Sequence, residues 1–190
     1  MHNHTALATM CLKFTFLTFM FQATQRFSCS PKTILGIDPG FVCAGYAIIT
    51  TESRGLQILE IGAFRQTSQQ SISTRIGKFY TFFAKLAEEK QITHLSLEIP
   101  FLGKNAQNFL KLGYLRGVLN LLCYQKGYAL LEFSPREIKN AITGYGQADK
   151  QQLASALQML FPSLKNFGSL PLDATDALAV SICAGLQNSQ

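Results

Sequence analysis

Residues 34–49 read ILGIDPGFVCAGYAII, and this stretch contains two apolar segments joined by a turn. Residues 33–37 form a continuous apolar run, residues 38–40 are Asp-Pro-Gly, and residues 42–50 are rich in residue types that favour strands. Such a pattern predicts two strands linked by a short turn. Residues 56–64, LQILEIGAF, alternate between apolar and polar and predict a third strand. Three consecutive strands with short links predict an antiparallel meander.

The rest of the chain alternates between helical and strand patterns. Between residues 71 and 90, apolar side chains recur at spacings of four, three, four and three, which predicts an amphipathic helix. These side chains are Ile72, Ile76, Phe79, Phe83 and Leu86. The further predictions are strands at 93–99 and 128–133 and helices at about 105–124, from Ser134, from Asp149 to Leu160, and at 171–186. We therefore predict an α/β fold with a five-stranded mixed sheet, its first three strands antiparallel, flanked by helices.

The length and composition suit one globular domain with a sizeable core, because the chain has 190 residues and is 47% hydrophobic. We expect this domain to span residues 33–188. Residues 1–32 contain no acidic residue and include an apolar run at 14–21 that is too short to span a bilayer. The segment fits either a targeting peptide or a disordered or spurious upstream extension. We favour the extension and assign no function to it.

The charge distribution favours a polyanionic partner. The net charge is +6 and the isoelectric point is about 9.1. Between Glu98 and Asp173 lie eight Lys or Arg residues and only three acidic ones. The five cysteines are odd in number, widely spaced and free of any C-x-x-C pair, which argues against a disulfide framework and a zinc site. These features fit a protein of the reducing cytoplasm with no membrane association.

Four acidic residues stand where burial is expected. Asp38 directly follows the first strand, and Glu98 lies at the end of the fourth. Asp173 and Asp176, three residues apart at the start of the last helix, share one helix face. Each acid alone has an ordinary structural explanation, as a turn residue, a strand end, an N-cap or a first-turn acid. Taken together, however, the four could converge at one end of the sheet.

Convergent carboxylates repel one another unless cations neutralise them. Hard oxygen ligands select Mg²⁺ or Mn²⁺, and two such ions about 4 Å apart form a clamp for in-line displacement at a phosphodiester. We therefore predict two Mg²⁺ ions per active site, with Mn²⁺ able to substitute. Asp38, on the first and central strand, is expected to bridge the ions, and the other three acids are expected to complete their coordination.

Four blocks of the sequence resemble, in order and with similar spacing, the signature blocks of the RuvC family of crossover junction endodeoxyribonucleases. They are ILGIDPGFVCAGYAII at 34–49, LSLEIPFLGKNAQNFLKLGYLRGVL at 95–119, EFSPREIKNAITGYGQADKQQL at 132–153 and DATDALAVSICA at 173–184. The resemblance covers residues 34–186. It implies an RNase H-like fold, a homodimer, and Mg²⁺-dependent paired nicks in strands of like polarity of a Holliday junction during homologous recombination and DNA repair. It also implies a branch-migration complex of RuvA and RuvB type proteins as partner.

The resemblance places the family's four acidic ligands on the same four acids that the burial argument selects: Asp38, Glu98, Asp173 and Asp176. Three nearby positions depart from the family pattern. Phe41 stands where a small polar residue often follows Asp-Pro-Gly, Ala44 stands where a Thr often precedes the next Gly, and Pro100 comes shortly after Glu98. These departures spare every acidic ligand and change the loops around them.

A junction nuclease must first hold phosphates, so basic side chains near the acids are candidates for DNA contacts. The predicted DNA contacts are Phe101, Lys104, Asn105, Lys111, Arg116, Arg136, Lys139 and Lys150. Lys139 and Lys150 resemble the family's DNA-contacting lysines, and Phe101 resembles its aromatic that stacks on an unpaired base. Asn105 could instead cap the following helix. Gly113 and Gly117 allow close helix approach, which suits either a dimer interface or packing on the sheet.

Three other functions remain open from the residues. An RNase H-like nuclease with another substrate, such as a ribosomal RNA precursor, would carry similar acids. A non-catalytic junction-binding protein would use the same basic surface, although carboxylates without cations beside phosphate would weaken its binding. An actin-like or sugar-kinase ATPase shares the D-x-G turn, but it needs a second nucleotide-binding lobe for which this chain has no room.

Overall fold

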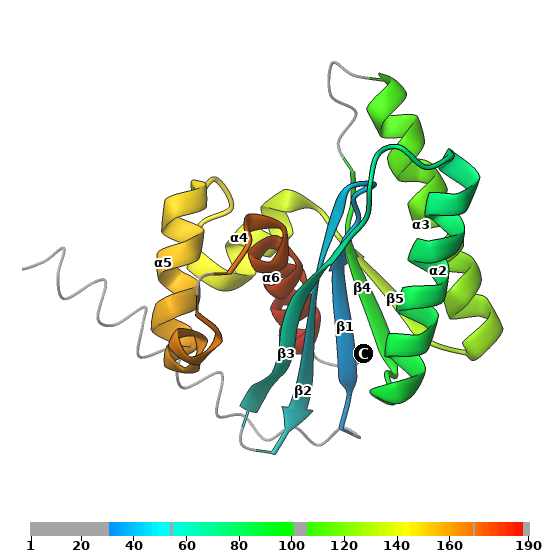
Figure 1. Cartoon of the computed structure of the whole chain (residues 1–190). Helices are drawn as coiled ribbons and strands as arrows, with labels where there is room; N and C mark the ends of the chain where they lie inside the picture. Colours follow the sequence, from blue (N-terminus) through cyan, green and yellow to red (C-terminus); the bar gives the residue numbers. More distant parts are fainter. Residues whose placement is uncertain (1–30, 54, 101–105, 169, 188–190) are drawn as a thin grey trace, which may run out of the picture.

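The computed structural model describes residues 31–53, 55–100, 106–168 and 170–187 (Figure 1). The interpretation of residues 1–30 as part of an extension lies outside the described residues. The predicted DNA contacts at Phe101, Lys104 and Asn105 also lie outside them.

Strands and helices lie where the sequence patterns predict them. The strands are β1 (Thr33–Asp38), β2 (Cys43–Glu52), β3 (Gly55–Arg65), β4 (His94–Glu98) and β5 (Ala129–Phe133). The helices are α2 (Ile72–Glu89), α3 (Ala106–Lys126), α4 (Pro135–Thr143), α5 (Lys150–Leu160) and α6 (Leu172–Leu186), with a short 3₁₀ helix η1 (Pro162–Phe167). Among the elements of the described residues, η1 alone was not predicted. It begins at Pro162, which ends the α5 hydrogen-bond pattern because proline has no N–H.

Local sequence explains where α4 and α5 begin. The Ser134 hydroxyl accepts a hydrogen bond from the Glu137 N–H, and the Glu137 carboxylate accepts one from the Ser134 N–H in return. Asp149 and Gln152 form the same reciprocal pair at the start of α5. These capping boxes satisfy backbone donors that the first helical turn leaves free. They confirm the predicted helix starts.

The five strands form one sheet in the order β3-β2-β1-β4-β5. The first three strands pair antiparallel, whereas β4 pairs parallel with both β1 and β5. The predicted mixed sheet is therefore confirmed. The strand that ends at Asp38 is its central strand.

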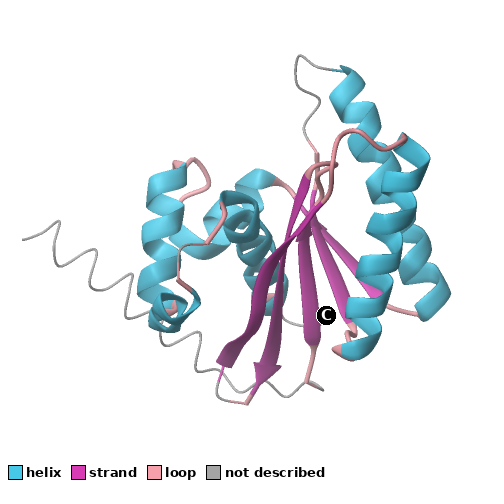
Figure 2. Ribbon diagram, viewed as in Figure 1, coloured by secondary structure: helices cyan, strands magenta, loops and turns pink. Residues whose placement is uncertain are grey.

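Helices cover both faces of the sheet (Figure 2). One face packs against α2 and α3 through a cluster that includes Leu35, Ile37 and Phe83. The opposite face packs against α4, α5 and α6 through a second cluster that includes Ile34 and Ile49. Within the described residues, no helix is both long enough and apolar enough to cross a membrane.

Helix α6 lies directly on the sheet because glycines leave it room. A Cβ built on Gly36 of β1 would overlap the Ala177 carbonyl oxygen and come within 2.7 Å of the Ser181 Cβ. A Cβ on Gly45 of β2 would overlap the Asp173 carbonyl oxygen. Two glycines on neighbouring strands thus allow the helix backbone to touch the strands, a close approach that any larger residue would prevent. This contact fixes where the first turn of α6 lies.

Candidate active site

Four carboxylates come to one edge of the sheet from three parts of the chain. Asp38 ends β1 and Glu98 ends β4, and these strands are parallel with Ile37 paired to Leu97. The carboxyl ends of parallel neighbours meet at the same edge, which is where α/β proteins commonly bind ligands. The first turn of α6, held on β2 at Gly45, adds Asp173 and Asp176 at this edge.

The electrostatics show that these acids interact. Burial raises the pKa of Asp38 to about 7, and the charges of Asp176, Asp173 and Glu98 add to the rise. Burial also raises the pKa of Glu98, with a further rise from Asp176, whereas Lys150 and then Lys139 act in the opposite direction. Bringing several carboxylates together out of water is unfavourable unless a cation compensates. The edge is therefore suited to binding positive charge.

The side chains are not arranged as a closed metal cage. Among the described residues, no group of three or more His, Cys, Asp or Glu side chains is close enough together to hold one ion. Asp176 lies 3.4 Å from the Lys150 ammonium instead. The predicted binding of metal by these four acids stays a prediction.

The donor set nevertheless fits a hard divalent cation. All four candidates are carboxylates, the ligand type that Mg²⁺ and Mn²⁺ prefer. Burial, followed by a hydrogen bond to Asp173, raises the pKa of the Cys43 thiol, so that Cys43 adds no charge near neutral pH. Oxygen donors thus provide the negative charge here.

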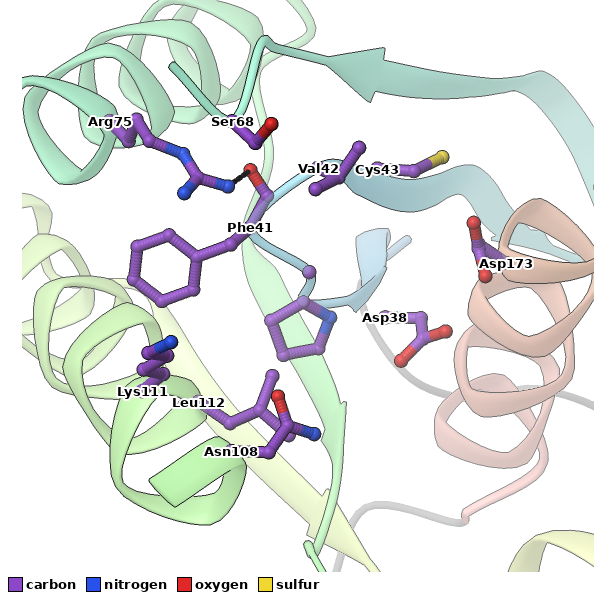
Figure 3. Close-up of a pocket in the computed structure, with 12 residues that line it drawn as sticks. Asp38, Phe41, Val42, Cys43, Ser68, Arg75, Asn108, Lys111, Leu112 and Asp173 are labelled. Atoms are coloured by element: carbon purple, nitrogen blue, oxygen red, sulfur yellow. Dashed lines mark hydrogen bonds between the residues drawn. The ribbon is translucent and has the colours of Figure 1, made fainter. Parts of the chain in front are cut away.

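A pocket of about 450 Å³ opens beside Asp38 (Figure 3). The turn between β1 and β2 forms its middle, with the start of α6 on one side and α2 and α3 on the other. Asp38 and Asp173 line the α6 side. Arg75 and Lys111 line the opposite side.

Arg75 supports the turn that follows Asp38, a role that the sequence patterns did not predict. Its Nη2 donates a hydrogen bond of 2.5 Å to the Phe41 carbonyl oxygen, and its guanidinium lies 4.9 Å from the centre of the Phe41 ring. Arg75 is buried on the same helix face as Phe79 and Phe83. The available signal was its position four residues before Phe79, which puts a cation on an apolar face.

The described DNA-contact candidates have different surroundings. We call the end of the sheet that carries Asp38, Glu98, Asp173 and Asp176 the acidic edge. Lys139 and Lys150 lie near it, since their charges act to lower the pKa of Glu98, which burial raises. Lys111 and Arg136 are exposed, and Lys111 lines the pocket. Contact of these four side chains with DNA stays a prediction.

Arg116 is the exception among these candidates. It donates a hydrogen bond of 2.5 Å to the Glu98 carbonyl oxygen and forms an ion pair with Glu132. Its side chain is only 12% exposed. These bonds make Arg116 a residue that positions the end of β4. Its predicted contact with DNA stays a prediction.

The sheet order, the helices on both faces and the acidic edge define a nuclease of RNase H-like fold. The solved structure of Thermus thermophilus RuvC in complex with a Holliday junction substrate has the same fold, with a TM-score of 0.73 at 19% identity over 80% of this chain and 92% of that chain. The family model described as crossover junction endodeoxyribonuclease RuvC matches residues 34–184, and the chain belongs to that family.

Curated relatives agree with this family assignment. A protein of Chlorobium phaeovibrioides named crossover junction endodeoxyribonuclease RuvC is 36% identical over 153 residues, which cover 79% of each chain. One of Chloroherpeton thalassium with the same name is 34% identical over 155 residues, covering 82% of each chain. Nucleases of this family are metal-dependent. The resemblance found in the four sequence blocks is thereby confirmed.

Proposed function

We propose that this protein is a structure-selective DNA endonuclease that resolves Holliday junctions by paired hydrolysis of phosphodiesters in strands of like polarity. The observation that carries the proposal is the acidic edge, where Asp38 ends the central strand and has a pKa of about 7 next to three further carboxylates. Membership of the RuvC family and the names of its relatives support this substrate. The activity would serve homologous recombination and DNA repair in the cytoplasm, together with RuvA and RuvB type proteins.

Asp38, Glu98, Asp173 and Asp176 would hold two Mg²⁺ ions, for which Mn²⁺ would substitute. Bound divalent ions activate a water molecule and stabilise the leaving oxygen during phosphodiester hydrolysis. The protein's own contribution is to hold the four carboxylates together against their repulsion. The close contact of α6 with the strands and the support of the Asp38 turn by Arg75 provide that rigidity.

Lys139 and Lys150 would hold the DNA backbone near the cut. Lys150 is 76% exposed and lies 3.4 Å from Asp176, a pairing of low strength in water. Metal binding at Asp176 would therefore release Lys150 for a phosphate at little cost. Arg136 is one helical turn before Lys139 on α4 and would extend the same basic surface. Phe101, Lys104 and Asn105 remain predicted contacts.

Paired cuts require two active sites, and an exposed face of α3 is suited to a homodimer interface. Four large apolar side chains line this face at spacings of four, seven and three: Leu110, Tyr114, Leu121 and Tyr124, which are 58%, 44%, 48% and 87% exposed. Gly113 and Gly117 have no neighbour within 4 Å of an added Cβ. These glycines therefore do not pack on the sheet, so the interface is the alternative that remains for them.

We expect Leu121→Lys combined with Tyr124→Lys to convert the protein to monomers, because buried apolar anchors dominate interface energies. Light scattering with size-exclusion chromatography measures the mass. The variant should nick single strands without coordinated second cuts, since each monomer keeps its own acids. Met159→Lys, at a residue 69% exposed on α5, is the matched control and should leave the mass unchanged. A dimer of unchanged stability in the double variant would place the interface elsewhere.

The proposed function is tested by incubating the protein with a mobile four-way junction, a linear duplex or an RNA hairpin, in Mg²⁺ or in EDTA. We expect paired nicks in the junction only, and only with the metal. Preferential cleavage of the RNA would indicate an RNase H-like nuclease with another substrate. Junction binding without nicking in Mg²⁺ or Mn²⁺ would indicate a non-catalytic junction-binding protein.

A further inference from the structure

The pocket beside Asp38 is divided by charge. Asp38 and Asp173 lie on its α6 side, whereas Arg75 and Lys111 come from α2 and α3 on the far side of the Phe41 turn (Figure 3). A cation bound by the acids and an anion held by the two bases would therefore be neighbours. Such a division suits a polyanionic strand that crosses the pocket.

Arg75 is a buried cation that pairs with no anion in the described part of the chain. It is 9% exposed, and none of the ion pairs among the described residues includes it. Its Nη2 is bonded to a neutral carbonyl oxygen, and its buried Nε has no hydrogen-bond partner in the described part of the chain. Buried Arg residues normally pair with an acid, because desolvating a charge and a donor without compensation is costly. The free donor points to an anionic ligand.

Lys111 provides a second positive charge at the same pocket. Lys111 is exposed on α3, and it forms no ion pair among the described residues. An exposed Lys alone is ordinary surface. A Lys that lines a pocket together with an unpaired, buried Arg makes a site in which one donor is preorganised and the other can move.

We propose that Arg75 and Lys111 form a phosphate subsite that holds the phosphate next to the scissile one on the cleaved strand. This inference rests on the proposed junction nuclease function and deepens it. With the scissile phosphate at the carboxylates, the adjoining phosphate of the same strand extends across the Asp-Pro-Gly turn toward the two bases. Holding it there aligns the cut bond with the acids.

Arg75 also has a structural role, since it bonds to the Phe41 carbonyl and stacks on the Phe41 ring. That role uses Nη2 and the guanidinium face, so other N–H groups of Arg75 remain for a phosphate in the pocket that Arg75 lines. The two roles are compatible, because a phosphate bound at those groups would tighten the same turn that carries Asp38. The experiment must therefore separate phosphate binding from folding.

Junction binding is measured in Ca²⁺ without cleavage, at several salt concentrations, for the wild type, Lys111→Gln and Lys85→Gln. Each lost phosphate contact reduces the slope of log affinity against log salt by about 0.9. We expect that reduction for Lys111→Gln, with affinity about tenfold lower. Lys85, 74% exposed near the opposite end of α2, is the matched control and should leave the slope unchanged.

The position of the phosphate is tested by placing one neutral methylphosphonate at each site around the cut. We expect one flanking position to weaken wild-type binding, and to weaken binding by Lys111→Gln less, because that variant keeps only the Arg75 contact. Arg75→Lys should reduce the same penalty. If Arg75→Lys lowers only the melting temperature, and both variants keep the wild-type penalty at every position, the subsite is wrong. A wild type that neither binds nor nicks the junction would instead overturn the proposed function, and this pocket assignment with it.

Discussion

Replacement of Asp38 by Asn is expected to slow junction nicking by roughly 10³-fold or more, which corresponds to about 4 kcal/mol of lost transition-state stabilisation. Asn keeps the size of the side chain but removes the charge at the centre of the acidic edge. Binding of the junction should persist, because less negative charge near the phosphates favours association. Single-turnover nicking and gel-shift titrations measure the two properties. A nicking rate within tenfold of the wild-type rate would show that Asp38 is not a catalytic residue.

The same variant should be more stable than the wild type without metal at high pH. Burial raises the pKa of Asp38 to about 7 in the folded protein, against 3.8 for an ordinary Asp. Between these values the folded state binds more protons than the unfolded state, so wild-type stability falls as the pH rises. We expect a loss of about 1 to 3 kcal/mol, which Asn at this position would avoid.

Urea denaturation in EDTA at pH 4 and pH 8 measures this difference. The advantage of Asp38→Asn should be small at pH 4, where the wild-type carboxyl is protonated in the folded state, and largest at pH 8. Addition of Mg²⁺ at pH 8 should stabilise the wild type more than the variant. A stability difference that is independent of pH would show that repulsion among these carboxylates has no bearing on folding.

Gly45→Ala is expected to cost about 3 kcal/mol of stability or more, because its methyl group would overlap the Asp173 carbonyl oxygen and lie 2.6 Å from the Ala174 nitrogen. Both atoms belong to the α6 backbone, which cannot rotate away as a side chain can. The helix must shift from the sheet and carry Asp173 and Asp176 with it. Chemical denaturation measures the free energy of unfolding, and nicking at low temperature measures the remaining folded fraction's activity.

Gly77→Ala is the matched control for this substitution. Gly77 is exposed on α2, with nothing within 4 Å of an added Cβ. Ala there should raise the free energy of unfolding by about 0.5 to 1 kcal/mol through helix propensity alone. If Gly45→Ala were as stable and active as the wild type, close packing of α6 on β2 would not be what holds the acids in place.

Much of the fold follows from short-range patterns in the sequence. The alternating pattern at 56–64 correctly predicted β3, and the apolar spacing at 71–90 correctly predicted α2. Ser134 and Asp149 cap the helices that they were expected to begin. These features depend on residues within one or two turns of each other. The antiparallel pairing of the first three strands followed from their short links.

The features that escaped prediction depend on contacts between distant segments. Gly36 and Gly45 lie in strands, although glycine lowers the local preference for strand structure. Their presence is explained by the close packing of α6, which leaves no room for a Cβ at either position. Arg75 contacts a turn 34 residues earlier, and Arg116 bonds to a strand end 18 residues earlier. Sequence spacing cannot reveal such partners. For the same reason, the four acids could be chosen from the sequence, whereas the spread of their side chains could not.

The order of the secondary-structure elements along the chain also determines when the four acids can come together. Asp38 is made early, but Asp173 and Asp176 come from the helix that is synthesised after every strand. A nascent polypeptide from which α6 has not yet emerged therefore has an incomplete set of acids and an incompletely covered sheet face. The acidic edge is completed only once α6 docks against β1 and β2, so cutting would have to wait for that docking.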